Sequence, residues 1–328
     1  MPAANSFDTT NPGSAVSNRE NLANGFYMIA PAETPFTGAL KKGPSLKTPQ
    51  HDWTCDDYGV INPQSVAEGK AATEFTNQGR NRARVFNVIS IFEETAGVTD
   101  VQQRTNNAAV TDEFVAGIER AMLRLNLKVE AAATGAQARV LSDPRNSAGF
   151  ANMLSGSSTV FADGAEDYQT PAGHNKAATK PTEKNVNEVL EAMHISGANT
   201  TNIQVFTDAK WMSAFTRETT RLIDDPADNK VTINLDGNSY KISQKVSIYQ
   251  GQHGYIVFRD LNPRCSTPTR AQLDRAIFLD MSMAELHEMK PLNEQPDGNG
   301  AGQLAVMKRY PLFVLRNGKA GGYWSSIA

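Results

Sequence analysis

The chain has 328 residues, a formal net charge of −3 at pH 7, and hydrophobic and charged fractions of 40% and 20%. That length allows one large or two ordinary domains with a substantial core. Tight binding of bulk nucleic acid needs several Lys or Arg in one patch, and the slightly acidic balance does not suggest it.

The cysteines and the N-terminus bear on where the protein is made. Cys55 and Cys265 stand far apart and outside any CxxC motif, so neither a zinc site nor a disulfide framework is indicated. The first residues lack the basic and apolar regions of a signal peptide, and no apolar run approaches the ~18 residues of a membrane span. We therefore expect a soluble protein, synthesised in a cytoplasm, with no membrane partner.

The first 49 residues are predicted to form an arm. Residues 1–17 are polar and small, and Ser17-x-x-Glu20 has the capping-box pattern that opens a short predicted helix through Ile29. From Pro31 onward, repeated prolines predict an extended strap rather than a packed layer.

Residues 50–85 lack a helical period, and their few large apolar side chains, such as Trp53, are too thinly spread to close a core. An excursion of this length is either disordered or a two-stranded loop that packs on something outside its own domain. Arg80, Arg82 and Arg84 alternate and would share one face of a strand. They either face solvent at a strand edge or contact acidic groups on a neighbouring chain.

The longest stretch with one consistent period runs from Asn107 to Ala133, after a β-rich run from Val85 to Ile91 and a polar connection. Its apolar residues recur every three or four positions, which predicts a helix of roughly 35–40 Å with an acidic, capped N-terminus. Arg120, Arg124 and Lys128 form a basic row along it. The helix is either a core helix with a solvated basic face or a structural spine whose charged side touches another chain.

Beyond Gly135 the sequence becomes irregular, with a polar insertion at 162–181 that looks longer and looser than a core needs. A helix, a short strand and a second helix then predict a compact α+β unit over about 182–215. The remaining predictions are a hairpin at Asp236-Gly237, strands at 245–250, 254–261 and 276–281, a loop at 291–302, two C-terminal strands and a second hairpin turn at Asn317-Gly318.

Catalytic signals are scarce. The glycine-rich run 298–302 precedes a strand rather than a helix, so it does not fit a phosphate loop, and His287-Glu288 lacks a second ligand at helical spacing. The five histidines are scattered and are interpreted as surface or core-edge residues. Three acidic doublets, at 56–57, 93–94 and 224–225, are interpreted as solvated loop charge rather than carboxylate dyads. We predict no active site, no cofactor and no metal site.

The succession of parts does resemble a known family. The motifs that carry the resemblance span the chain in order: Ser17-x-Arg19-Glu20-x-Leu22, Ile29-Ala30-Pro31-x-x-Thr34-Pro35-Phe36, His51-x-Trp53, Glu68-Gly69, Gly97-Val98-Thr99 followed by Ala109 and Gly117, and Phe278-Leu279-Asp280 with Lys290-Pro291-Leu292. With the strap, the thin loop, the long helix and the α+β unit, the layout resembles the major capsid (head) protein of tailed bacteriophages, with the Hong Kong 97 type fold.

The resemblance implies an α+β capsid fold divided into an N-terminal arm (1–49), an extended loop (50–85), a peripheral domain (86–181 and 285–328) with the spine helix at about 107–133, and an axial domain (182–284). It implies a non-enzymatic protein that assembles with itself as hexamers and pentamers into the shell of a virion. That shell would enclose DNA without sequence-specific binding. Because no long coiled-coil leader precedes the arm, we expect a separate scaffolding protein, besides a portal and possible decoration proteins.

The residues expected at assembly interfaces are charged or aromatic residues of the arm, the loop and the spine helix: Arg19, Glu20, Trp53, Glu68, Lys70, Arg80, Arg82, Arg84, Arg120, Arg124 and Lys128. A strap and loop without a core of their own would be stable only when draped over adjacent subunits. Three rival interpretations remain: an encapsulin-like compartment shell, a phage tail or decoration protein, and an α+β enzyme or sugar-binding protein with a polar pocket.

Overall fold

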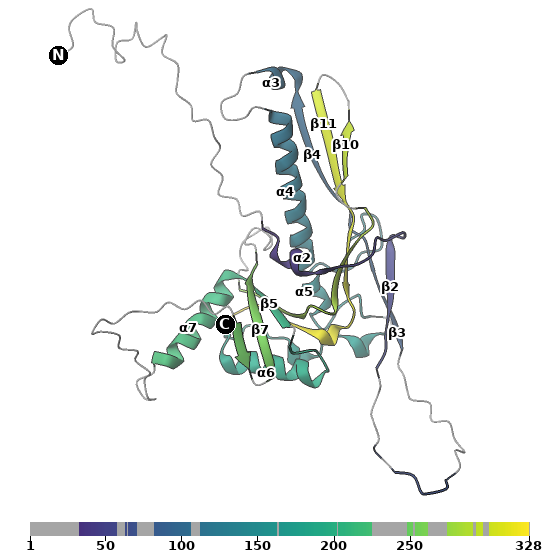
Figure 1. Ribbon diagram of the computed structural model, residues 1–328, viewed down its shortest axis with the longest axis vertical. Helices are drawn as coiled ribbons and strands as arrows, with labels where there is room; N and C mark the ends of the chain where they lie inside the picture. The colour runs from purple at the N-terminus through teal and green to yellow at the C-terminus, as the bar shows by residue number, and fades with distance from the viewer. Residues whose placement is uncertain are drawn as a thin grey trace, which may run out of the picture.

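A computed structural model provides the structure of the protein, and it describes residues 33–57, 63, 65–70, 82–105, 112–162, 164–201, 203–224, 248–251, 253–261, 274–290, 293–297 and 302–327. The described chain has three parts (Figure 1). The first, called the tall arm and distinct from the N-terminal arm of residues 1–49, is built on a long helix. A compact α+β unit lies at its foot, and a two-stranded ribbon lies on the side away from that unit. Within this described part, no helix is long and apolar enough to cross a membrane.

The tall arm consists of helix α4 (Glu113–Thr134) packed on a three-stranded antiparallel sheet. The sheet order is β10 (Asn293–Asp297), β11 (Gly302–Arg309) and β4 (Phe92–Thr99), and α3 (Asp100–Arg104) leads from β4 toward α4. The long helix is confirmed from Glu113 onward, with the Asp112 side chain accepting from the amides of Phe114 and Val115. The expected start at Asn107 lies outside the described residues.

The predicted apolar stripe faces the sheet, as helical periodicity requires. Leu125 is fully buried with Ala121 on the helix, against Ala96 of β4 and Met307 of β11. Strand β4 itself was not predicted, because its sequence, FEETAGVT, is largely polar. Its Glu93-Glu94 doublet is not solvated loop charge, since it lies within a paired strand.

The proline-rich strap packs into the main core, which corrects the prediction that it is only extended. It forms α2 (Pro35–Ala39) and β1 (Lys41–Lys42), and β1 pairs in parallel with β9 (Ala284–Glu288), which pairs in turn with β12 (Pro311–Leu315). Phe36 is fully buried, with ring centroids 5.2 Å from Phe150 of α5 (Phe150–Met153) and 4.7 Å from Phe206. Three segments that are far apart in the sequence therefore meet around these rings.

The insertion at 162–181 is not loose. Its 3₁₀ turns η1 (Glu166–Tyr168) and η2 (Ala172–His174) bury Tyr168 and His174, each 1% exposed. The Thr170 hydroxyl donates to the carbonyl of Gly318 at 2.8 Å, and His174 Nδ1 lies 2.8 Å from the carbonyl of Gly321. The segment therefore seats the C-terminal strand of the chain.

The predicted α+β unit is confirmed as a five-stranded mixed sheet covered on one face by α6 (Glu183–Ile195) and α7 (Ala209–Asp224). Its core is aromatic, with Trp211 fully buried and packed around by other rings. The hairpin expected at Asp236-Gly237 lies outside the described residues. The strand order is β13 (Gly321–Trp324), β8 (Ala276–Asp280), β5 (Ile203–Thr207), β7 (Gly254–Asp260) and β6 (Ile248–Gly251), with β5 and β7 parallel.

The hairpin expected at Asn317-Gly318 is wrong. The preceding strand β12 pairs with β9 and the following strand β13 pairs with β8, so the two belong to different sheets. A 3₁₀ turn, η3 (Gly318–Ala320), connects them, and the Asn317 side chain caps it by accepting from the Lys319 amide. A Cβ at Gly318 would lie 2.6 Å from the carbonyl oxygen of Tyr168, so this glycine allows a close approach rather than a hairpin turn.

The ribbon is formed by β2 (Gln50–Cys55) and β3 (Ala83–Val88), paired antiparallel with Gln50 opposite Val88. This confirms the two-stranded alternative for the base of the loop. Along β3 the burial alternates, with Ala83 and Val85 buried and Arg84 exposed.

Candidate assembly surfaces

One face of the ribbon is fastened to the body of the chain. From β2, Trp53 Nε1 donates to the carbonyl of Arg316 at 3.2 Å, and Cys55 Sγ donates to the same oxygen at 2.9 Å. Burial raises the pKa of the Cys55 thiol to about 11, so the thiol stays protonated and unreactive. From β3, the buried Asn87 amide donates to the carbonyl of Phe313 at 2.8 Å. We call this contact the ribbon seat (His51, Trp53 and Cys55 of β2 against β9, β12 and Arg316).

The opposite face carries the predicted arginines. Arg82 pairs with Asp56 at 2.9 Å and Arg84 with Asp52 at 2.5 Å, both across the ribbon. Their side chains are 63% and 70% exposed, so each pair contributes little to stability. The prediction that these arginines share a face is confirmed for Arg82 and Arg84, whereas Arg80 lies outside the described residues.

Glu68 and Lys70 lie further along the loop and are exposed. The Lys70 amide donates to the carbonyl of Ala67 and closes a turn there. Arg19 and Glu20 belong to the first 32 residues, outside the described part of the chain.

The basic row of α4 lies beside the acidic doublet of β4. Lys128 Nζ is 2.6 Å from a carboxylate oxygen of Glu94 and donates to the Glu93 carbonyl at 2.8 Å. Arg124 reaches the same Glu94 oxygen only at 3.6 Å and its side chain is 71% exposed, while Arg120 is also exposed. The C-terminal end of the row thus holds the helix on its own sheet, and the exposed Arg124 and Arg120 form the outer part.

Glu130 joins α4 to the strap, and the sequence reasoning missed it. Its carboxylate is fully buried and accepts from the amides of Phe36 and Thr37, both at 2.8 Å, where α2 begins. Burial raises the pKa of this carboxyl, although the two amides oppose the shift. Its position near the C-terminal end of the predicted helix could have indicated this role. An acidic residue there is unfavourable beside the helix dipole, unless another segment of the chain donates hydrogen bonds to it.

A second carboxylate that was not predicted lies where the ribbon meets the sheet of β1, β9 and β12, which we call the strap sheet. Glu285 is buried and its oxygens lie 3.3 Å from Lys41 Nζ, 2.8 Å from Arg316 Nη2 and 3.1 Å from His287 Nε2. Burial alone would raise the pKa of Glu285, but hydrogen bonds from His287 and Lys41 and the charge of Arg316 lower it. The group stays ionised and binds three segments together.

A buried ion pair connects the compact unit to the foot of α4. Arg275 Nε lies 3.1 Å from the carboxylate of Asp208, and its Nη1 donates to the carbonyl of Thr134 at 2.8 Å. Both side chains are at most 6% exposed. A guanidinium at a helix C-terminus also complements the helix dipole.

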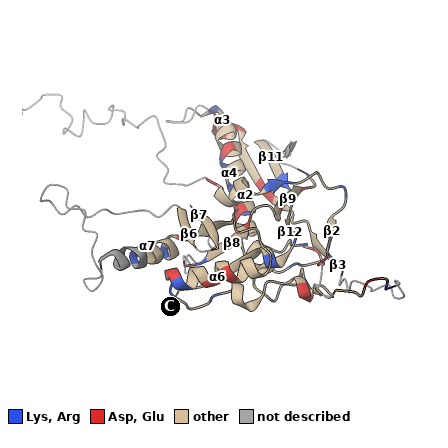
Figure 2. Cartoon of the chain, turned by 60° about the horizontal axis from the view of Figure 1, so that its bottom comes forward, with Lys and Arg blue, Asp and Glu red and all other residues tan. Residues whose placement is uncertain are grey.

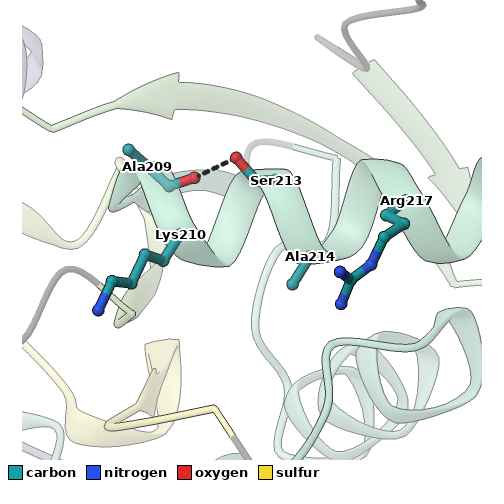
Figure 3. Close-up of a pocket in the computed structure, with 5 residues that line it drawn as sticks. All are labelled: Ala209, Lys210, Ser213, Ala214 and Arg217. Carbon is teal, nitrogen blue, oxygen red and sulfur yellow. Dashed lines mark hydrogen bonds between the residues drawn. The ribbon is translucent and has the colours of Figure 1, made fainter.

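A shallow hollow of about 380 Å³ lies along α7 (Figure 3). Its lining contains two cations but no carboxylate, imidazole or thiol, and the Ser213 hydroxyl already donates to the Ala209 carbonyl. Ser213 therefore has no histidine or carboxylate beside it in this lining to act as its general base. The lining residues are Ala209, Lys210, Ser213, Ala214 and Arg217.

Two further findings concern charge and metal binding. Figure 2 shows lysines and arginines interspersed with acidic residues along α4 and around β9. Among the described residues, no group of three or more His, Cys, Asp or Glu side chains could hold a metal ion.

Two pairs of histidines that are far apart in the sequence stack on each other. The ring centroids of His51 and His287 are 4.7 Å apart, and those of His194 and His253 are 5.5 Å apart. Their separation in sequence did not indicate these contacts.

Comparison with known proteins gives a family match and a set of structural neighbours. Residues 4–303 match the family described as SU10 major capsid protein. The fold is similar to the capsid of a native GTA particle, with a TM-score of 0.64, 10% identity, and 98% of this chain and 99% of that chain covered. No curated protein matches the sequence.

Two other neighbours are informative. A structure from Mycobacterium phage Bobi matches with a TM-score of 0.59 at 12% identity, covering 98% of this chain and 99% of that chain. The holo-SrpI encapsulin complex from Synechococcus elongatus PCC 7942 matches with a TM-score of 0.55 at 9% identity, covering 96% and 94%. At such identities these likenesses establish the fold of the chain.

Proposed function

The chain belongs to the SU10 major capsid protein family and is a major capsid protein of the tailed-phage type, and we propose that it assembles as hexamers and pentamers into an icosahedral head shell around the phage DNA. The α+β Hong Kong 97-like fold predicted from the sequence is confirmed. The observation that carries the proposal is the family match over residues 4–303, which spans nearly all of the N-terminal arm, the loop, the spine helix and the compact unit up to β8.

The geometry of the ribbon supports this proposal. Its base is held to the body by the ribbon seat, by Arg139 on β3 and by Lys319 beside Asp57, whereas the described residues 65–70 further along are exposed. A thin projection of this kind gains stability from a neighbouring copy, and many modest contacts of the same type add up to a rigid shell. The exposed Arg120 and Arg124, together with Arg82, Arg84, Glu68 and Lys70, are the described residues that we propose for such contacts.

We propose the domain division stated above, with one amendment. The compact unit, which corresponds to the axial domain (182–284), also includes β13, because this strand pairs with β8. Residues 86–181 and the rest of 285–328 form the peripheral domain, built around α4.

The partners and the lack of activity are also proposals. The protein would use a separate scaffolding protein, a portal and possibly decoration proteins, and would be synthesised in the host cytoplasm before entering the virion. It would enclose DNA without sequence-specific binding, and the net charge of −3 suits a wall that holds a dense polyanion without adhering to it. The match to a structural capsid protein family supports a protein with no enzymatic activity.

Electron microscopy of the protein, purified alone and co-expressed with its neighbouring structural genes, tests the assembly. We expect closed shells of uniform size. Particles that stay monomeric under all conditions, or tubes and isolated trimers, would contradict the proposal. The likeness to an encapsulin makes a compartment shell the second candidate, and a packaged enzyme in place of DNA in purified particles would favour it.

A charge exchange tests whether the ribbon arginines act between copies. Arg84→Asp should block or mis-size assembly whether Arg84 serves its own Asp52 or a neighbour. The double variant Asp52→Arg with Arg84→Asp restores only the internal pair. Failure of this double variant to assemble, with an unchanged circular dichroism spectrum, is expected for an intermolecular contact; normal shells would place the role of Arg84 inside its own ribbon.

A further inference from the structure

Three aromatic rings form a column at the ribbon seat. Trp53 and His51 are alternate residues of β2 and share one face, with ring centroids 6.1 Å apart. The His51 ring in turn stacks on His287 of β9, with centroids 4.7 Å apart and planes inclined by 30°. His51 is therefore the ring through which β2 stacks on β9, beside the hydrogen bond that Asn87 of β3 donates to β12.

Two acceptor oxygens flank the ring nitrogens of His287. Its Nδ1 lies 3.0 Å from the carbonyl oxygen of Pro44 in the strap, and its Nε2 lies 3.1 Å from a carboxylate oxygen of Glu285. Both oxygens are acceptors, and a neutral imidazole has only one N–H, so only the imidazolium can donate to both. The strap backbone passes directly against this ring, since a Cβ at Gly43 would lie 2.1 Å from His287 Cε1.

The charges around His51 favour its neutral form. The acids nearest to it are already paired, Asp52 with Arg84 and Glu285 with both Arg316 and Lys41. Burial first, and then the charge of His287, lower the pKa of His51, while Asp52 and Glu285 only partly offset them. Opposite His51 on β3 stands the uncharged Asn87.

We propose that the ribbon seat is a protonation-dependent latch: neutral His51 stacked on charged His287 holds the ribbon closed, and a proton taken up by His51 releases the base of the ribbon from the strap sheet. A second positive charge 4.7 Å from His287 would find no unpaired acid among the described neighbours. The latch joins the strap, the ribbon and β9, so acid would loosen the loop and its attachment to the strap together.

The direction of the pH dependence follows from the linkage between proton binding by His51 and closure of the ribbon. A histidine whose folded-state pKa is depressed takes up its proton more readily in the open state. Its contribution to closure is therefore complete above the ordinary pKa of histidine, about 6.5, and is lost as the pH falls from there toward the lowered value.

Hydrogen exchange with mass spectrometry on the full-length chain before assembly tests the latch, with rates corrected for the intrinsic effect of pH. Between about pH 7.5 and about pH 5.5, we expect the opening of amides in β2 and β3 to increase by up to about tenfold, while α6 changes little. His51→Lys should show the open ribbon already at the higher pH. His51→Phe and His51→Gln, which cannot take up a proton, should remove the pH dependence.

The second stacked pair gives a matched control. His253→Lys places the same charge beside His194, at a stack of 5.5 Å remote from the ribbon, and should leave ribbon exchange unchanged. Equal protection of the wild-type ribbon at both pH values, or the same acid sensitivity in His51→Phe and His51→Gln, would overturn the latch. Because the measurement uses unassembled chain, its result is independent of whether shells form.

Discussion

The compact unit and the tall arm differ in how they close their cores. In the compact unit, α6 and α7 cover a five-stranded sheet, and Trp211 is surrounded by Phe215, Phe258, Phe278 and Trp324. In the tall arm, α4 covers one face of a three-stranded sheet, and the buried cluster between them consists of two alanines, one leucine and one methionine.

The difference shows which part depends on its surroundings. The outer side of α4 leaves Val115 and Leu123 50% and 43% exposed, and its charged row is exposed over most of its length. The large buried rings of the compact unit stabilise it strongly, because each ring removes a large apolar area from water. The tall arm buries little apolar area of this kind. It depends on ion pairs, on the strap and, by our proposal, on neighbouring copies.

Truncating the aromatic core is expected to have the largest effect. Trp211→Ala should lower the free energy of unfolding by about 4 kcal/mol, because it removes a fully buried ring and leaves a cavity. Urea unfolding followed by circular dichroism measures this. The matched control is Trp53→Ala at the half-buried ribbon seat, which should cost clearly less; an equal loss would contradict the contrast between a closed core and an open seat.

Breaking the joint between the two regions comes next. Arg275→Ala removes the guanidinium that faces the buried Asp208 carboxylate and should destabilise the chain by about 3 kcal/mol. The double variant Arg275→Met with Asp208→Asn removes both charges and should recover part of that loss in the same unfolding experiment. A double variant as unstable as the single one would show that the packing at this site, rather than the unpaired charge, sets the cost.

A cavity in the arm should cost less and act locally. Leu125→Ala is expected to lose about 2 kcal/mol, at the low end for a buried leucine, because the one-sided arm can collapse around the gap. Hydrogen exchange should rise in α4, β4 and β11 and stay unchanged in β5 and β8. An equal rise in all five elements would mean that the arm and the compact unit unfold together.

The strap contact should have a smaller, pH-dependent effect. Glu130→Gln places an amide N–H₂ against one of the two donating amides of α2 and should cost about 1 kcal/mol near neutral pH. Because burial raises the pKa of Glu130, the wild-type chain loses stability as the pH rises from the ordinary value of about 4.5 through the raised value. Thermal unfolding across that range should show this slope in the wild type and not in Glu130→Gln.

The surface row of α4 should matter least for the isolated chain. Arg124→Ala is expected to change stability by less than about 0.5 kcal/mol, and added salt should reduce the effect further. If Arg124 contacts a neighbouring copy, the same variant should impair assembly measurably. Shells of normal size and yield would exclude that contact.

Local patterns were enough to predict several elements. The 3.6-residue period of α4, the capped helix at Glu183, the apolar run of β8 and the order of motifs along the chain each depend on residues close together in sequence. These led to the α+β fold and the capsid family. The two-stranded ribbon was one of two alternatives for residues 50–85, because their polar sequence does not indicate whether the two ends pair as strands.

Contacts between distant segments could not be predicted from local patterns. Phe36 is buried because Phe150 and Phe206 form a pocket for it, and Glu130 meets the strap across 94 positions in sequence. Asn317-Gly318 has the composition of a hairpin turn, yet the partners β9 and β8 determine where the flanking strands go. A local signal fixes the conformation of a few residues, whereas burial and charge pairing depend on which segments the whole fold brings together.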